Sequence, residues 1–124
     1  MVVLDKTTIG KQAEDAACLF LQNKGFRLLQ RNFRCYYGEI DLIMQDQHDI
    51  VFIEVRSRRS IEYGNAYESI TQQKIKKLIK TAKYFLQKQG YLNKVNSRFD
   101  VIAIHPIAGI KQLEWIRDAF TVGN

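Results

Sequence analysis

The order of the predicted secondary structure, α-β-β-β-α-β-β, indicates a mixed five-stranded sheet with helices packed against it, an α/β or α+β arrangement. Two long segments repeat apolar residues at helical spacing, and five shorter segments have the apolar or alternating pattern of strands. The 124 residues contain no internal repeat and no linker rich in proline or glycine. This length and continuity predict one domain over residues 1–124.

The first helix is predicted near the N-terminal end of the sequence. Thr7 or Thr8 can cap it, and it reaches to about Lys24, where Gly25 ends it. Its apolar stripe faces the core and comprises Ala13, Ala16, Ala17, Phe20 and Leu21. Cys18 lies beside this stripe, so we expect it to fill the core as a free thiol, as we expect Cys35 to be free.

The second helix is predicted from about Ser69 to Gln89, with Gly90 as its end. Its apolar residues match a 3.6-residue period closely. They are Ile75, Leu78, Ile79, Ala82, Phe85 and Leu86. Because this helix separates the third and fourth strands, it can serve as a crossover that makes those strands parallel.

Strands are predicted at Phe26–Asn32, at Arg98–Ile104 and at Gln112–Phe120. Two more come from the hairpin "GEIDLIMQDQHDIVFIEVR", Gly38 to Arg56, whose turn is centred on Asp46–Asp49. That turn sets a register in which one face holds only apolar pairs: Ile40 with Val55, Leu42 with Ile53, and Met44 with Val51. The other face pairs Ile43 with Phe52, Asp41 with Glu54, and Glu39 with Arg56.

Asp41 and Glu54 therefore face each other beside apolar neighbours. Opposed side chains in a hairpin have Cβ atoms about 4.5–5.5 Å apart, and like charges at that distance are destabilising. Such a pair needs a cation or a shared proton, and Mg2+ prefers carboxylate oxygens as ligands. The alternative is that both acids lie on a solvated face and pair with Arg56 and nearby lysines.

Asp41 followed by the triplet Glu54-Val55-Arg56 resembles the PD-(D/E)xK nuclease motif. The pattern "GKQAEDAACLFLQNKGFRLLQRNFR…GEIDLIMQD…IVFIEVRSRR…RFDVIAI" also resembles the YraN family, or UPF0102, along nearly the whole chain. That family is similar to restriction-endonuclease-like folds and archaeal Holliday junction resolvases. The resemblance implies an α/β restriction-endonuclease-like core in a single nuclease-like domain.

The resemblance also implies roles for individual residues. Asp41 and Glu54 become ligands of Mg2+ or Mn2+, with the backbone carbonyl of Val55 as a further ligand. Glu14 matches a glutamate that approaches the metal or its water shell, and its alternative is an exposed acid on the helix flank. These residues and Arg56 form the expected catalytic set.

Arg56 departs from the motif, which has lysine at this place. Arginine stays protonated and cannot act as a general base, although it can stabilise charge on a phosphate transition state. Lys74, on the flank of the second helix, can supply a lysine from elsewhere, and its alternative is a solvated lysine.

The net charge of +6 favours a polyanionic partner, above all nucleic acid, and we expect DNA. The expected contacts are Arg56, Arg58, Arg59, Lys74 and Lys77. Tyr63 and Tyr67 can stack on unpaired bases or pack in their loop. The alternative for the lysines is an ordinary solvated helix face.

The leading hypothesis is thus a metal-dependent endonuclease that acts on DNA, including branched or damaged DNA. The alternatives are a non-catalytic nucleic-acid-binding module of the same fold and a protein-interaction subunit. No apolar run is long enough to span a membrane and no signal peptide is recognisable, so we expect a cytoplasmic protein. Junction enzymes of this fold commonly dimerise, which suggests a homodimer.

Overall fold

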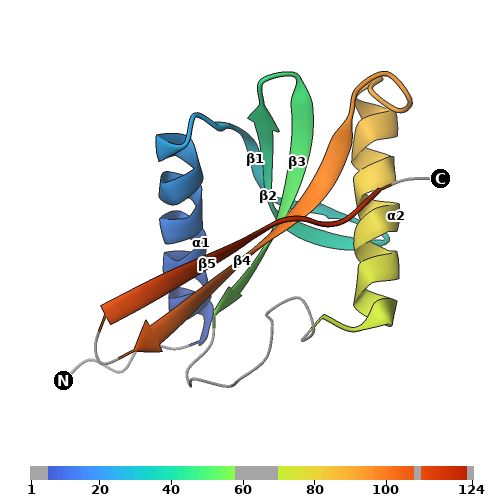
Figure 1. Cartoon of the computed structure of the whole chain (residues 1–124). Helices are drawn as coiled ribbons and strands as arrows, with labels where there is room; N and C mark the ends of the chain where they lie inside the picture. The colour runs from blue at the N-terminus through green and yellow to red at the C-terminus, as the bar shows by residue number, and fades with distance from the viewer. Residues whose placement is uncertain (1–5, 58–69, 108–109, 123–124) are drawn as a thin grey trace.

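The computed structural model describes residues 6–57, 70–107 and 110–122. Figure 1 shows a sheet with one helix on each side. The elements follow the predicted order: α1 (Lys6–Asn23), β1 (Arg27–Cys35), β2 (Gly38–Asp46), β3 (Asp49–Ser57), α2 (Gln72–Lys88), β4 (Ser97–Ile107) and β5 (Ile110–Phe120). The predicted α/β class with a mixed five-stranded sheet is confirmed.

The strands are arranged in the sheet in chain order, from β1 to β5. All neighbours are antiparallel except β3 and β4, which run parallel with α2 between them in the chain. The predicted crossover is therefore confirmed. None of the helices in the described part of the chain is both long and apolar enough to cross a membrane.

Each face of the sheet has its own core. The α1 face is built on Ala17, Leu21, Leu42, Met44, Val51, Ile53 and Ile102, among others. The α2 face is built on Ile40, Ile43, Phe52, Leu78, Phe85, Phe99 and Val101, among others. Because both faces of β3 are covered, this strand is an almost continuous apolar run, as expected for a strand buried on both sides.

The helix ends differ from the predictions in detail. Helix α1 begins at Lys6, so the predicted cap at Thr7 or Thr8 is wrong: both residues have helical backbone, whereas a cap must not. Helix α2 begins at Gln72 rather than near Ser69, because the Thr71 side chain accepts a hydrogen bond from the Lys74 N–H at 3.1 Å and caps the helix there.

The buried stripe of α2 includes Thr81, which was not predicted, whereas Ile79 is only partly buried. The Thr81 hydroxyl donates to the Lys77 carbonyl at 2.8 Å, which satisfies its polar group inside the core. Gly38 approaches this point so closely that a Cβ atom on it would lie 3.1 Å from Thr81 Oγ1. The β1–β2 hairpin therefore packs directly on α2 (Figure 1).

That hairpin reaches α2 because it bends. Asn32 has left-handed backbone, with φ at 52°. Arg31 forms ion pairs with α1, whereas Phe33 belongs to the core on the α2 face. Strand β2 bends with its neighbour, since Leu42 packs on the α1 face and Ile40 on the α2 face.

The bend corrects part of the predicted β2–β3 register. The pairs from Asp46–Asp49 to Leu42–Ile53 are confirmed. Beyond Leu42 the ladder stops, so the predicted pairs Ile40–Val55 and Glu39–Arg56 are wrong. Ile40 instead pairs with Phe33 and Glu39 with Arg34, because β2 leaves β3 there and follows β1.

Candidate active site

The candidate active site lies where β2 and β3 separate. Immediately after the last ladder pair, Leu42 with Ile53, a carboxylate oxygen of Asp41 accepts the backbone N–H of Val55 at 2.8 Å. A side chain thus replaces the ladder hydrogen bond. Glu54 lies next to Asp41 in this gap, within reach of a hydrogen bond between the two carboxyl groups. The structure therefore brings together the two acids that the sequence paired.

The electrostatics of this pair are unfavourable without a cation. Burial raises the pKa of Asp41, and so do the negative charge of Glu54 and a hydrogen bond with it. The Val55 N–H acts in the opposite direction, and the charge of Glu14 adds a smaller increase, so that the pKa of Asp41 reaches about 8. At neutral pH Asp41 therefore holds a proton unless a further positive charge, such as a metal ion, replaces it.

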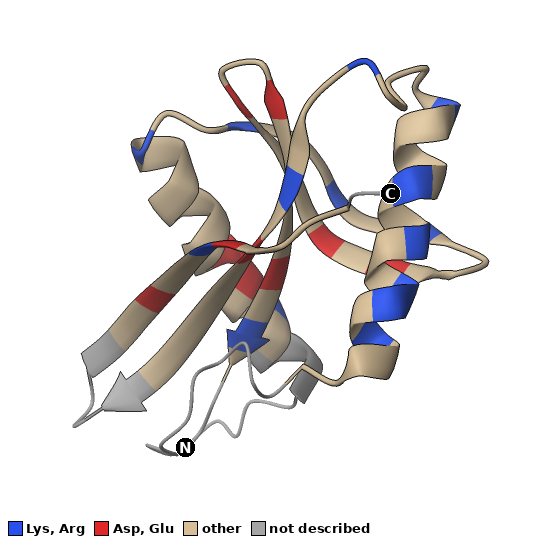
Figure 2. Cartoon of the chain, turned by 45° about the vertical axis from the view of Figure 1, so that its right-hand side comes forward, with Lys and Arg blue, Asp and Glu red and all other residues tan. Residues whose placement is uncertain are grey.

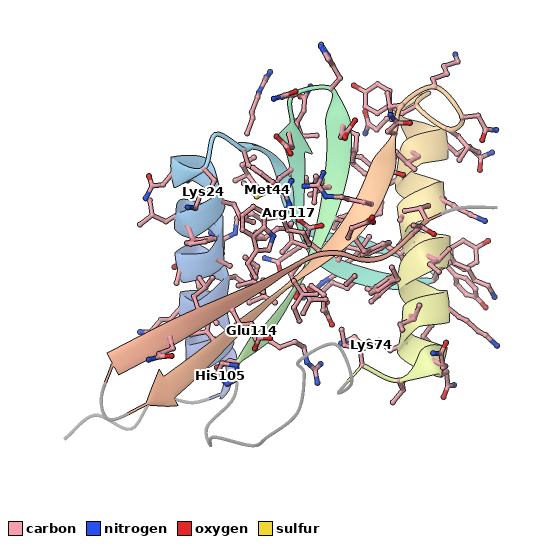
Figure 3. All side chains as sticks on the ribbon, in the orientation of Figure 1. Lys24, Met44, Lys74, His105, Glu114 and Arg117 are labelled. Atoms are coloured by element: carbon pink, nitrogen blue, oxygen red, sulfur yellow. The ribbon has the colours of Figure 1, made fainter. Side chains whose placement is uncertain are left out.

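Glu54 is the more buried of the two acids, with 3% of its surface exposed. Its Oε2 atom is fully buried and accepts no hydrogen bond. Lys74 lies on the first turn of α2 (Figure 3), and its Nζ comes within 2.6 Å of this oxygen. This contact is an ion pair, and Oε2 has no further hydrogen-bond partner. Arg56 Nη1 lies further away, at 3.9 Å.

Glu14 lies on α1 at the edge of this site. It is partly buried, and its carboxylate forms an ion pair with Arg31 at 3.6 Å. Arg31 also contacts Asp15 at 2.7 Å. Within the part of the chain that the structure describes, no three side chains of His, Cys, Asp or Glu are grouped as metal ligands. The approach of Glu14 to a metal stays a prediction, as does a metal contact of the Val55 carbonyl.

Two clefts lie near the acids, although neither Asp41 nor Glu54 lines them: one includes Lys74, which contacts Glu54, and the other includes Glu14. The first, called here the α2 cleft, has a volume of about 390 Å³ and is lined by Gly38, Glu39, Thr71, Gln73, Lys74, Lys77 and Leu78. The second, the α1 cleft, has a volume of about 500 Å³ and is lined by Gly10, Lys11, Glu14, Arg31, Asn32, Arg34 and Glu39. Both include Glu39, so they adjoin across the start of β2.

Basic side chains line both clefts. Lys74 and Lys77 line the α2 cleft, and further lysines follow along α2 (Figure 2). Arg56 is partly buried beside Glu54. The other predicted nucleic-acid contacts, Arg58 and Arg59, lie outside the described residues, and so do Tyr63 and Tyr67.

Comparison with known proteins places the chain in a family. The model of "Uncharacterised protein family UPF0102" matches residues 13–104. The chain belongs to UPF0102. A UPF0102 protein of Nitrosococcus oceani is 49% identical over 113 residues, which cover 91% of each chain. The UPF0102 protein VP0448 of Vibrio parahaemolyticus is 42% identical over 123 residues, which cover 99% of this chain and all of that one.

A solved structure also resembles this UPF0102 chain. It is titled "The structure of Pyrococcus Furiosus SfsA in complex with Ca2+", and it shares 14% sequence identity and a TM-score of 0.39. The similarity covers 91% of this chain but only 63% of that one. Similarity of this size identifies neither a shared activity nor a shared ligand.

Sequence reasoning missed the basic residues of the α1 cleft, in particular Arg31 and Arg34. In the structure Arg31 pairs with Leu42 and so lies on the strand next to Asp41. Alternation along the sequence could not show this pairing, because the β1–β2 register shifts between Leu28 and Gln30 and the backbone of Asn32 is left-handed.

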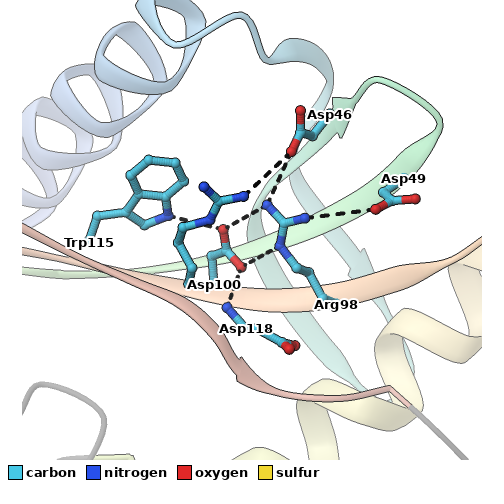
Figure 4. A network of polar contacts seen from close by, with 7 residues as sticks. Asp46, Asp49, Arg98, Asp100, Trp115 and Asp118 are labelled. Carbon is cyan, nitrogen blue, oxygen red and sulfur yellow. Dashed lines mark hydrogen bonds and ion pairs between the residues drawn. The ribbon is translucent and has the colours of Figure 1, made fainter.

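This UPF0102 chain holds a second buried carboxylate centre at Asp100 of β4, which pairs with Ile53 of β3 (Figure 4). Asp100 is fully buried and accepts hydrogen bonds from Arg98 Nε at 3.0 Å, Trp115 Nε1 at 3.0 Å and the Asp118 N–H at 2.9 Å. Burial tends to lower the pKa of Arg98, but its bonds to Asp100 and Asp46 raise that pKa overall. The contacts of Asp100 join β4 to β5 and give it a structural role.

Proposed function

We propose that this protein is a metal-dependent endonuclease that hydrolyses phosphodiester bonds of DNA. The observation that carries the proposal is the pair of acids at the β2–β3 separation. Two carboxyl groups are held together in a partly buried site, and a buried oxygen of Glu54 has no hydrogen bond. Two adjacent carboxylates cost a fold stability, and Lys74 contacts only one of them, whereas a divalent cation would balance both charges.

The donor set suits Mg2+ or Mn2+. Mg2+ keeps several waters and is often held by only one or two carboxylates together with substrate phosphates. Asp41 and Glu54 supply that number, so the lack of a third acid among the described residues agrees with this kind of site. When bound, the ion lowers the pKa of its water and polarises the phosphate.

Lys74 and Arg56 together take the role of the lysine in the PD-(D/E)xK motif. Lys74 Nζ is the nearer cation to Glu54, at 2.6 Å against 3.9 Å for Arg56 Nη1. Both can hold a phosphate oxygen and stabilise the charge that develops on it. Arg56 stays protonated, so of these two cations only Lys74 can act as a proton donor or acceptor.

Basic side chains around the clefts support DNA as the substrate. Each lysine or arginine that neutralises a phosphate releases counterions and makes binding dependent on salt. The α1 cleft supplies Lys11, Arg31 and Arg34, and the α2 cleft supplies Lys74 and Lys77. The two clefts meet at Glu39, so together they suit an extended substrate, including branched DNA.

One observation favours a second function, a non-catalytic module that binds nucleic acid. Lys74 already places a positive charge on Glu54 without any metal. In this alternative the ion pair only neutralises the acid, and the clefts bind DNA without cutting it.

The test is cleavage of linear, single-stranded and junction DNA by the purified protein with Mg2+, Mn2+ or EDTA. We expect metal-dependent cleavage that Asp41→Asn and Glu54→Gln both abolish. The matched control is Asp118→Asn, an exposed acid in β5, which should cut like the parent. Circular dichroism verifies that each variant folds. Cleavage that survives both changes refutes the assignment of the site, and DNA binding without cleavage by the parent favours the second function.

A further inference from the structure

The tip of the β1–β2 hairpin carries an exposed aromatic cluster, called here the tyrosine platform: Tyr36, Tyr37 and Tyr84. Tyr36 is 97% exposed and Tyr37 and Tyr84 are 44% and 40% exposed. The rings touch edge to face, at 5.6 Å between Tyr36 and Tyr37 and 6.3 Å between Tyr37 and Tyr84. Tyr84 in turn lies 6.3 Å from the ring of Phe33, which is buried in the core.

Stability of the fold does not explain this cluster. A ring that is almost wholly exposed, like that of Tyr36, buries little apolar surface and so contributes little hydrophobic free energy. The contact with Tyr84 nevertheless anchors Tyr37 to a helix whose other face is packed in the core. The platform is thus exposed and held by a rigid element, which is the arrangement expected of a binding surface.

The platform adjoins the candidate active site through the α2 cleft. Gly38 follows Tyr37 directly and lines that cleft together with Lys77. A Cβ atom on Gly38 would lie 4.0 Å from the Cβ of Lys77. Lys74 lines the same cleft and contacts Glu54. A single extended ligand can therefore lie on the platform and along the cleft as far as Lys74, the residue that contacts Glu54.

The charge around the platform identifies the ligand as a polyanion. Lys77 and Lys80 are exposed on α2 and lie close to the phase of Tyr84, and the helix sequence from Gln72 to Lys88 contains no acid. The nearest acid along the hairpin, Glu39, forms an ion pair with Arg34 at 3.3 Å. Aromatic faces beside basic side chains bind single-stranded nucleic acid, because bases stack on the rings while the cations track the backbone.

We propose that the tyrosine platform binds unpaired bases of a single-stranded segment next to the scissile site. Tyr36 and Tyr37 stack on the bases, and Lys77 and Lys80 bind the phosphates that lead into the α2 cleft. This inference rests on the nucleic-acid substrate of the proposed function and adds a preference for DNA in which duplex and single strand meet.

The test measures binding in EDTA, by fluorescence anisotropy at low salt. The probes are a labelled thymidine oligonucleotide and a labelled blunt duplex of equal length. We expect Tyr36→Ala and Tyr37→Ala each to weaken single-strand binding about tenfold, as loss of a base–aromatic stack does. Duplex binding should change less than about twofold, because phosphate contacts dominate it. Tyr36→Phe should retain the affinity of the parent, since stacking uses the ring and not the hydroxyl.

Tyr91→Ala is the matched control. Tyr91 is 39% exposed and lies beyond the other end of α2, away from the α2 cleft. Its removal should leave both affinities unchanged. Equal losses on the two probes, no loss on either, or no binding by the parent would each overturn the proposal. So would a change of oligomeric state in Tyr36→Ala with unchanged single-strand affinity, because the platform would then be an interface between copies of the chain.

A parallel reaction with Mg2+ separates this inference from the proposed function. A parent that binds the single strand through its tyrosines but cuts nothing refutes the endonuclease and supports the platform. The opposite outcome is that the parent cuts DNA, and that the Tyr36→Ala and Tyr37→Ala variants cut DNA and bind the single strand as well as the parent does. This result supports the endonuclease and refutes the platform.

Discussion

Asp100 and the Asp41–Glu54 pair are two buried carboxylate centres in one sheet, and they differ in how their charge is balanced. Asp100 is surrounded by donors from Arg98, Trp115 and the backbone of Asp118. Asp41 and Glu54 lie against each other, with one backbone donor on Asp41 and an oxygen of Glu54 that has no hydrogen bond. The first centre is balanced by several donors within the fold, whereas the second has two adjacent carboxyl groups and one close ammonium, that of Lys74.

This difference shows how a structural acid can be told from a functional one. A buried charge whose hydrogen bonds are all satisfied holds elements together, and its removal leaves several groups unpaired. A buried acid beside another acid costs stability until a cation or proton arrives. The same substitution chemistry should therefore have opposite effects on folding at the two centres.

The largest effect is expected for Asp100→Ala. The change leaves the Arg98 guanidinium, the Trp115 indole N–H and the Asp118 N–H without their shared acceptor. Breaking one partner of such a network costs about 3–5 kcal/mol. Urea unfolding followed by circular dichroism measures the free energy. A loss below about 1 kcal/mol would mean that Asp100 is not the structural centre of β4 and β5.

A smaller effect, of opposite sign, is expected for Asp41→Asn in metal-free protein. The pKa of Asp41 is raised to about 8 in the folded state from its ordinary value of 3.8. The folded parent is therefore stabilised most below pH 3.8, and it loses that stability as the pH rises to about 8. Asparagine cannot ionise, so the variant should keep its stability over this range.

The measurement is the free energy of unfolding of parent and variant in EDTA, at pH 4 and at pH 9. From pH 4 to pH 9 the free energy of unfolding of the variant should rise relative to that of the parent by at least about 1.4 kcal/mol, which corresponds to one pKa unit. Asp118→Asn is the matched control, because Asp118 is exposed and joins the Asp100 network through its backbone N–H. The raised pKa would be contradicted if the difference in free energy of unfolding between Asp41→Asn and the parent changed as little from pH 4 to pH 9 as the difference for the control does.

The sequence predicted part of the geometry around Asp41 and Glu54. The alternation of apolar residues predicted the register from Asp46 to Leu42 correctly, because a slip of one residue exchanges the two faces. It did not predict the bend at Asn32, since left-handed backbone at one asparagine depends on packing of the hairpin on α2. The bend separates β2 from β3 and turns Asp41 from a ladder residue into an acceptor for Val55.

Of the contacts between distant segments, the sequence suggested that of Lys74 but not those of Asp100. Helical phase suggested Lys74 as a lysine for the site, and the structure places its Nζ beside Glu54. The role of Asp100 had no local signal, because its donors come from β5 through an irregularity in the β4–β5 register between Phe99 and Val101. The spacing of apolar residues indicates which face of a helix or strand is buried, but it does not indicate which distant donors hydrogen-bond to a buried carboxylate.

The smallest effect is expected at the rim of the Asp100 centre, for Arg117→Ala. Arg117 is 58% exposed, and its guanidinium lies 3.9 Å from Asp46 and 4.9 Å from the centre of the Trp115 ring. Exposed pairs of this kind contribute about 0–1 kcal/mol, because water screens them. Arg98→Ala provides the comparison, since Arg98 is only 15% exposed and contacts both Asp46 and Asp100.

Urea unfolding of the two arginine variants decides whether burial controls the strength of this network. Arg98→Ala should cost more than Arg117→Ala, since it leaves the buried Asp100 carboxylate without its cation, whereas Asp46 keeps Arg98 when Arg117 is lost. Added salt should reduce the small contribution of Arg117 and leave that of Arg98 almost unchanged, because exposed charges are screened far more than buried ones. Equal losses in the two variants would show that the network depends on the number of its ion pairs rather than on their burial.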